Sequence, residues 1–181
     1  MEHGVFPGEL VPSPEVTDEA IDSYRLLSAD IASGVAVVST RLRGRDYAAT
    51  VSGFLSVSYD PPTLLVSLYA DSRIAEAVLD SGTWALSLLS ARQRGTANWL
   101  ASPGSPLEGL LSQVDYGRGP ATGAAVIEGC IAWFEVRTTQ VTTAATHQLV
   151  VGEVLAMGRR ATAGDEADPL VHFASAYGRL A

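Results

Sequence analysis

The sequence contains no lysine, and all twelve of its basic residues are arginine. Schiff-base chemistry and the Walker-type phosphate loop each need an amine on a flexible stem, so this chain can use neither. Twenty acidic residues leave a net charge of −8 at pH 7. Because a nucleic-acid partner requires a basic face that neutralises phosphates, this balance argues against nucleic-acid binding.

Cysteine and histidine are scarce as well. Cys130 is the only cysteine, which excludes an intrachain disulfide and a cysteine metal cluster, and we expect it to be a buried, unreactive thiol. The three histidines, His3, His147 and His172, lack metal-ligand spacing, so we predict no metal site. No G-x-S-x-G motif appears, which lowers the expectation of serine hydrolysis. The remaining possibilities are catalysis that uses a bound cofactor, or binding without catalysis.

Long apolar runs are also missing. None approaches the roughly 20 residues that a membrane span needs, so we expect no membrane association. The first twenty residues are acidic and contain prolines, unlike a signal peptide, which favours a cytoplasmic location. The length of 181 residues suits one domain, and we expect a flexible arm at residues 1–16 followed by the folded domain at 17–181.

The apolar pattern predicts more strand than helix. A leading helix is expected from residue 17, with Ile21, Tyr24, Leu27 and Ile31 on one face and Gly34 as its stop. Strands are expected at 35–40, 47–58, 63–68, 83–90, 124–141 and 147–157, and shorter helices at 71–82 and 91–101, the second interrupted by Gly95. Because strands and helices do not alternate one for one, we predict a mostly β fold: a closed or nearly closed antiparallel barrel of about six or seven strands with peripheral short helices.

Residues 102–123 are rich in glycine, proline and serine. A connection of this length usually carries a lid, a dimer contact or a pocket wall, and we expect one of these roles here.

Hydroxyl groups are concentrated in residues 48–68, "AATVSGFLSVSYDPPTLLVSL". Thr50, Ser52, Ser56 and Ser58 all fall in segments that read as core strand. These hydroxyls either face solvent on one side of a sheet or line a site for a polar ligand.

Five segments occur in an order that resembles the flavin reductase-like family of FMN-binding split barrels: "SGVAVVST", "AATVSGFLSVSYDPPTLLVSL", "DSRIAEAVLDSGTWALSLLS", "THQLVVGEVLAM" and "PLVHFASAYGRL". The second is the most specific, because it joins a Thr-Val-Ser start, an S-V-S step and an Asp-Pro-Pro end. The resemblance spans about residues 22–180. It implies a Greek-key, antiparallel split barrel and an NAD(P)H-dependent flavin reductase. It also implies a homodimer that supplies reduced FMN or FAD to a partner monooxygenase.

The same resemblance implies which residues hold the flavin. Thr50, Val51 and Ser52 would run beside the isoalloxazine ring, and Ser56 and Ser58 either share that face or point to solvent. Ser67, Ser72 and Arg73 would anchor the phosphate at a strand end and a helix start, with Arg92 and Arg94 as second choices. Alternatively, Ser72 is an ordinary helix cap and Arg73 a solvated charge.

His147 is expected at the catalytic site. The matching hairpin of the family commonly reads Gly-Asp-His, whereas here the triplet is Ala145-Thr146-His147, so the histidine is kept and the aspartate is missing. Hydride transfer needs two stacked rings rather than a protein acid, so we expect His147 to position the nicotinamide. A second departure is Glu135, where the family usually carries a cysteine.

Two other functions remain open at this point. One is a flavin- or deazaflavin-dependent oxidoreductase that acts directly on a small organic substrate. The other is a non-catalytic flavin- or haem-binding barrel with His147 or His172 as an axial ligand. The sequence does not choose FMN over FAD. It lacks a G-x-G-x-x-G fingerprint, so the nicotinamide, from NADH or NADPH, is expected over the flavin rather than in a Rossmann crevice.

Overall fold

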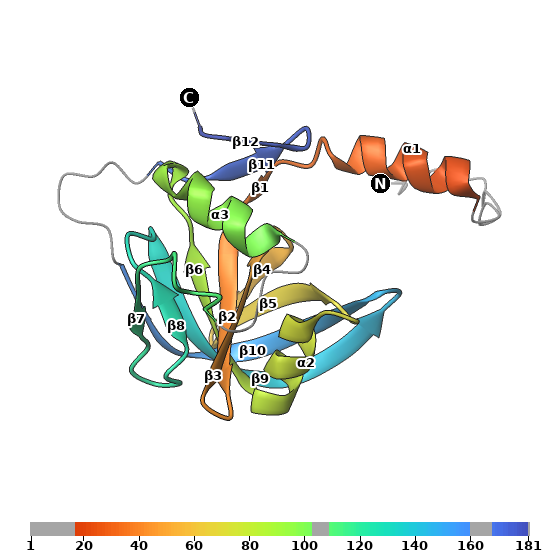
Figure 1. Cartoon of the computed structure of the whole chain (residues 1–181). Coiled ribbons are helices and arrows are strands. Elements are labelled where there is room, and N and C mark those ends of the chain that lie inside the picture. Colours follow the sequence, from red (N-terminus) through yellow and green to blue (C-terminus); the bar gives the residue numbers. More distant parts are fainter. Residues whose placement is uncertain (1–16, 103–108, 160–167, 181) are drawn as a thin grey trace, which may run out of the picture.

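The computed structural model of the protein describes residues 17–102, 109–159 and 168–180. Its centre is an antiparallel seven-stranded sheet that curls into a barrel, with short helices around it (Figure 1). Across the sheet the strands are β3 (Arg45–Val51), β2 (Ala36–Leu42), β6 (Thr83–Leu88), β9 (Ala132–Ala144), β10 (His147–Gly158), β5 (Pro62–Tyr69) and β4 (Phe54–Tyr59). The predicted mostly β, antiparallel barrel is confirmed. The expected arm at 1–16 and residues 160–167 lie outside the described residues.

The barrel closes where the chain passes from β3 to β4. We expected one strand over residues 47–58, and this was wrong, because Ser52 and Gly53 separate two strands that lie at opposite edges of the sheet. Six strand spacings would hold these edges about 29 Å apart in a flat sheet. Val51 and Phe54 are only three residues apart in sequence, which spans at most about 11 Å. The sheet must therefore curl, and we call residues 52–53 the seam.

The interior of the barrel is apolar and is covered by a helix. α2 (Arg73–Ser81) packs Ile74, Ala75 and Val78 against inward-facing strand residues such as Trp84 and Val150. Ser72 is its N-cap, and Gly82 ends the helix in the left-handed conformation at φ 67°, so the helix agrees with the range predicted over 71–82.

A second apolar layer covers the outside of β2 and β6. It contains α3 (Arg94–Ala101), a 3₁₀ turn (Ala91–Gln93) and the small ladder of β7 (Tyr116–Arg118) and β8 (Ala125–Ile127). Gly95 does not interrupt α3, because the extra backbone freedom of one glycine costs less than the packing of this helix gains.

The predicted strand over 124–141 is also wrong, since it is divided into β8 and β9 with Gly129 at φ 73° between them. Cys130 lies in this connection and is buried, as expected.

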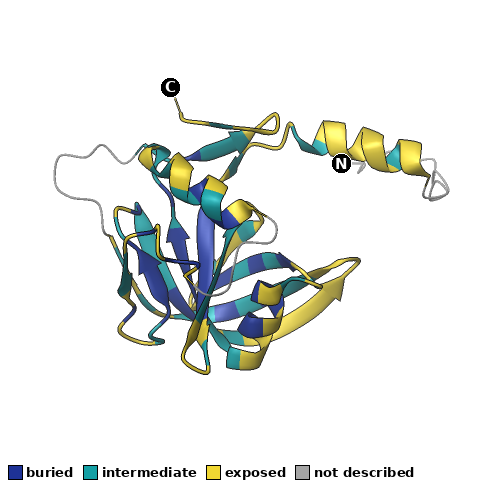
Figure 2. Ribbon diagram, viewed as in Figure 1, coloured by how far each residue is buried: buried dark blue, intermediate teal, exposed yellow. Residues whose placement is uncertain are grey.

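The N- and C-terminal segments meet outside the barrel. β1 (Ser33–Gly34), β11 (Val171–Phe173) and β12 (Ala176–Gly178) form a three-stranded sheet, and α1 (Asp18–Ser28) projects from it (Figure 1). α1 begins after Thr17 as predicted, but it ends at Ser28 and Gly34 is part of β1. The residues predicted to share one apolar face are exposed, as are most residues of α1 (Figure 2).

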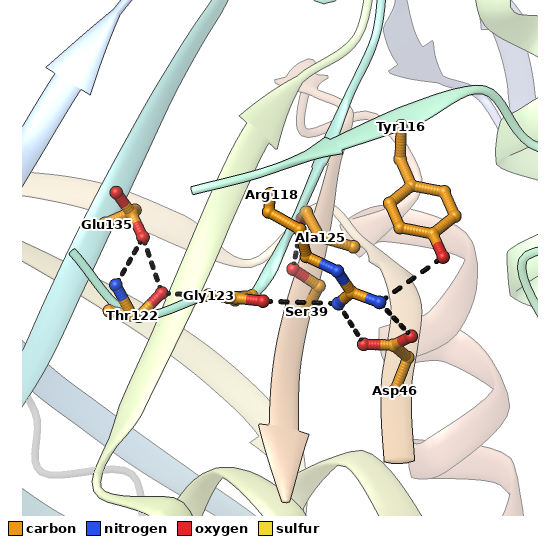
Figure 3. Close-up of polar contacts among 9 residues, drawn as sticks. Ser39, Asp46, Tyr116, Arg118, Thr122, Gly123, Ala125 and Glu135 are labelled. Atoms are coloured by element: carbon orange, nitrogen blue, oxygen red, sulfur yellow. Dashed lines mark hydrogen bonds and ion pairs between the residues drawn. The ribbon is translucent and has the colours of Figure 1, made fainter. Parts of the chain in front are cut away.

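A buried carboxylate fastens the outer layer to the sheet. Glu135 of β9 is fully buried and accepts a hydrogen bond from Ala121 N at 3.0 Å. It also accepts hydrogen bonds from Thr122 N (2.7 Å) and Thr122 Oγ1 (2.6 Å) (Figure 3). A Cβ atom on Gly119 would collide with this carboxylate, so the loop can approach it only as glycine. The glutamate that departs from the family pattern thus has a dedicated set of donors.

An ion pair joins the same layer to β3. Arg118 donates to both carboxylate oxygens of Asp46, at 2.5 and 2.8 Å, and to the carbonyl oxygen of Gly123 at 3.2 Å (Figure 3). The hydrogen bond to Asp46 raises the pKa of Arg118 above its ordinary value. The described part of the 102–123 segment is therefore bound closely to the barrel.

We expect Glu135→Gln to lower the free energy of unfolding by about 2 kcal/mol, because the new amide nitrogen would face donors and leave buried N–H groups without an acceptor. Urea unfolding measures this. The matched control is Glu153→Gln, which removes the charge of a half-exposed ion pair with Arg137 (2.8 Å) and should cost less than about 1 kcal/mol. Equal losses in the two variants would contradict the role assigned to Glu135.

Candidate functional site

A cavity of about 630 Å³ opens at the seam. Its size is in the range of small-molecule sites. Residues of β3, β5, α2, α3 and the start of β10 contribute to it. The lining consists of Ala49, Thr50, Val51, Ser52, Gly53, Ser67, Leu68, Tyr69, Ser72, Ile74, Leu100, Ala101 and His147. Six of the nine predicted site residues are in this set: Thr50, Val51, Ser52, Ser67, Ser72 and His147.

The backbone itself is a principal feature of the cavity. β3 pairs with β2 on one side, and among the described residues no strand pairs with its other side. The free edge of a strand presents N–H and C=O groups that can bind a planar ligand with complementary polar atoms. At the seam, Ser67 N donates to Gly53 O at 2.8 Å, and a Cβ atom on Gly53 would lie 3.2 Å from Ser67 Cβ. Gly53 therefore permits the close approach of the seam to β5.

Two of the predicted hydroxyl groups already have backbone partners. Thr50 donates to Ala97 O in α3 at 2.8 Å. Ser72 donates to Tyr69 O at 2.6 Å and accepts from Ala75 N at 3.2 Å, which is the ordinary N-cap arrangement. Their protons are used in holding α3 and α2 in place, so towards a ligand they can only accept a hydrogen bond. Ser52 and Ser67 are the lining serines without such a bond among the described residues.

The other three predicted residues lie elsewhere. Ser56 is exposed on β4, and Ser58 Oγ accepts from Asp60 N at 3.2 Å at the turn before β5. Arg73 lines a different cavity, between α2 and β3. The expectation that these residues share a site with Thr50 is therefore not met by the seam cavity. The reason for the two serines is that β4 belongs to the opposite edge of the sheet.

His147 is the first residue of β10 and is exposed at the cavity. It pairs with Tyr69 of β5, whose ring meets the imidazole edge-on with centroids 5.8 Å apart and planes at 66°. Its Nδ1 lies 3.1 Å from the hydroxyl of Thr146. Thr146 thus supplies a neutral polar contact at the position where the family commonly has aspartate.

The sequence analysis did not predict most of the apolar residues that line the seam cavity. Tyr69, Ile74 and Leu100 come from three separate elements, and their convergence depends on how the barrel closes. α3 does fold over the pocket, but it presents Leu100 and Ala101 rather than Arg92 or Arg94. One available signal was that Tyr69 follows the hydroxyl-rich segment directly at the end of a predicted strand.

His172 is not part of this site. It lies in β11, where it pairs with Ser33, and its ring meets that of Tyr177 at 5.8 Å. Burial raises the pKa of Tyr177. Within the described ranges, no three histidine, cysteine or acidic side chains gather as a metal site would require, and no helix is long and apolar enough to cross a membrane.

Comparisons with known proteins all lead to flavin reductases. The family model for the flavin reductase like domain matches residues 28–181. The protein named "Probable flavin reductase" from Rhizobium meliloti (strain 1021) is 33% identical over 144 residues, which cover 78% of this chain and 45% of that protein. The chain therefore spans less than half the length of this relative. The "Flavin reductase (NADH)" of Kitasatospora aureofaciens is 31% identical over 160 residues, covering 87% of this chain and 81% of that protein.

A solved structure has the same fold. BorF, described as the flavin reductase component of a bacterial two-component tryptophan halogenase, matches with a TM-score of 0.81 and 30% identity. The match covers 88% of this chain and 98% of BorF.

Proposed function

This chain belongs to the flavin reductase-like family, and from that premise we propose that it is an NAD(P)H-dependent flavin reductase that uses FMN or FAD. The observation that carries the proposal is the seam cavity, where the free edge of β3, small residues and apolar walls meet beside His147. A bound flavin supplies the redox chemistry, because it accepts a hydride from reduced nicotinamide and passes electrons on.

The residues of the cavity fit a planar, amphipathic ligand. Backbone groups of residues 50–52, with the hydroxyls of Ser52 and Ser67, would bind a polar ring edge, and Val51 and Leu100 would cover an apolar one. Gly53 keeps the backbone open to close approach. The lining contains no lysine, and the printed side-chain partner of His147 is Thr146 rather than a serine of the cavity.

We assign His147 a positioning role. Its Nδ1 is next to Thr146 Oγ1 and its ring edge is next to Tyr69, so two contacts limit the rotation of the imidazole. The ring is exposed at the rim rather than buried in the wall, which suits a contact with a second ligand that binds over the first. Tight ring-on-ring placement, not proton transfer, is what hydride transfer requires of such a group.

A partner that consumes reduced flavin is part of the proposal. BorF is described as one component of a two-component system, and the chain resembles it along most of its length. We propose a transient oxygenase partner, a monooxygenase in the simplest case, that receives reduced flavin from this protein.

The proposed assembly is a homodimer through the exposed apolar surface. Every second residue of edge strand β4, namely Leu55, Val57 and Tyr59, is 49–93% exposed, and Met157 of β10 is 62% exposed. A monomer rarely leaves so many large apolar side chains uncovered, and a free apolar edge strand promotes aggregation. A second copy of the chain would cover this surface in the common twofold arrangement.

Light scattering coupled to gel filtration should give twice the 19.0 kDa chain mass. Val57→Glu should shift the protein towards the monomer, since it introduces a charge into the apolar surface. Glu76→Gln, on the exposed side of α2, is the control and should leave the mass unchanged. A wild-type protein of monomeric mass would exclude the dimer.

The direct test of function is anaerobic mixing of the protein with FMN or FAD and with NADH or NADPH. We expect loss of flavin absorbance much faster than without protein, because the site holds both rings in contact. A rate equal to the rate without protein would contradict the proposal. Flavin that stays bound through purification, without reduction of added flavin, would instead support an oxidoreductase acting directly on a small substrate.

His147→Ala should slow nicotinamide-dependent reduction by about tenfold or more while changing the flavin dissociation constant less than about threefold, since the residue contacts the second ligand. Stopped-flow reduction and flavin titration separate the two effects. His172→Ala, which removes a histidine of the terminal sheet, is the matched control and should leave both values unchanged. A larger effect on flavin binding than on reduction would show that the role is wrong.

A further inference from the structure

A second cavity, of about 530 Å³, lies between α2 and the hairpin of β2 and β3. Three arginines line it, Arg43 and Arg45 from the hairpin and Arg73 from the start of α2. We call it the arginine groove. In a chain with twelve basic residues and a net charge of −8, three guanidinium groups in one cavity form a marked local concentration of positive charge.

The two hairpin arginines carry the inference. Arg73 already has an interaction within the protein, whereas among the described residues neither Arg43 nor Arg45 has an ion-pair partner. Guanidinium groups bind phosphate with two parallel hydrogen bonds, which makes unpaired arginines that line a cavity suitable for a phosphorylated ligand.

The arginine groove and the seam cavity follow one another along β3. Arg45 and Tyr47 line the groove, while Ala49 and Val51, on the same face of β3, line the seam cavity. At about 3.3 Å per residue the two pairs lie roughly 13 Å apart along the strand. α2 borders both cavities, because Ser72 and Ile74 line the seam cavity while Arg73, Glu76 and Asp80 line the groove. One elongated ligand can therefore occupy both cavities.

The other polar groups of the groove indicate more than a bare phosphate. Glu76 and Asp80 of α2 line it together with Tyr47. These carboxylates would repel a free anion, but they can accept hydrogen bonds from ribose hydroxyls or an exocyclic amine, and a tyrosine ring can stack on a base. Donors for phosphate, acceptors for sugar and one aromatic ring together match a nucleoside diphosphate.

We propose that the arginine groove binds the adenosine diphosphate end of FAD, whose flavin ring lies in the seam cavity. This inference rests on the proposed function and deepens it, because it selects FAD over FMN as the preferred flavin. FMN has no adenosine unit and leaves the groove without a ligand. Charged hydrogen bonds from Arg43 and Arg45 then contribute to FAD binding alone.

Isothermal titration calorimetry of FAD, FMN and ADP tests the assignment. Wild-type protein should bind FAD about tenfold more tightly than FMN, because each charge-assisted hydrogen bond favours only the longer ligand. The double variant Arg43→Gln/Arg45→Gln should lose about tenfold in FAD affinity and stay within about twofold for FMN. Both positions are exposed and glutamine keeps a polar side chain there, so the fold of the hairpin should not change. ADP should bind the wild type and compete with FAD, and it should not bind the variant.

The control Arg25→Gln/Arg179→Gln removes the same charge from two exposed arginines outside both cavities and should change none of these affinities. Equal effects of the groove variant on FAD and FMN, or no effect on either, would overturn the inference. So would a raised KM for the nicotinamide dinucleotide with unchanged FAD affinity, since the groove would then hold the adenosine of that ligand.

Failure of the inference and failure of the proposed function give different results. FMN binding and reduction without any ADP binding would leave the flavin reductase intact and refute the groove. Binding of ADP that depends on Arg43 and Arg45, without binding of either flavin, would support the groove as a nucleotide site and refute the reductase.

Discussion

The short connection at the seam forces the sheet to close into a barrel and places the cavity where its edges meet. Ser52 and Gly53 join strands that occupy the two edges of a seven-stranded sheet, and two residues cannot bridge a flat sheet of that width. Closure brings β3 next to β5, so the free backbone edge of β3 meets Ser67 and Tyr69. His147 lies at the same cavity because β10 pairs with β5. The cavity is thus a direct consequence of how the sheet closes.

The polar groups that hold the outer layer to the barrel differ from those that line the seam cavity. Glu135 and the Arg118–Asp46 pair bind the outer layer to the barrel, and neither lines the seam cavity. The polar side chains that line the cavity are exposed or half-buried, as His147 and Tyr69 are. Thr50 and Ser72 connect the two sets, since their hydroxyls position α3 and α2 while their side chains line the cavity.

The hydroxyl-rich segment, residues 48–68, contains both a position that the residue pattern placed correctly and two that it did not. Period-two alternation groups Ser52 with Ser56 and Ser58, but it assumes one continuous strand. The break at the seam places Ser52 at the cavity and the other two on the opposite edge, where Ser58 holds a turn. The prediction of residues 50–52 as site residues came from resemblance to a family, and the structure places all three in the cavity lining.

Local periodicity, turn residues and ordered motifs were enough to predict the antiparallel β class, the helix over 71–82, the β9–β10 hairpin and the family. The lack of lysine also excluded amine chemistry. Residue patterns did not predict that 47–58 is two strands, that α3 presents Leu100 to the cavity, or that Arg73 lies with Arg43 and Arg45. These facts depend on contacts between residues far apart in the chain, which local patterns do not specify.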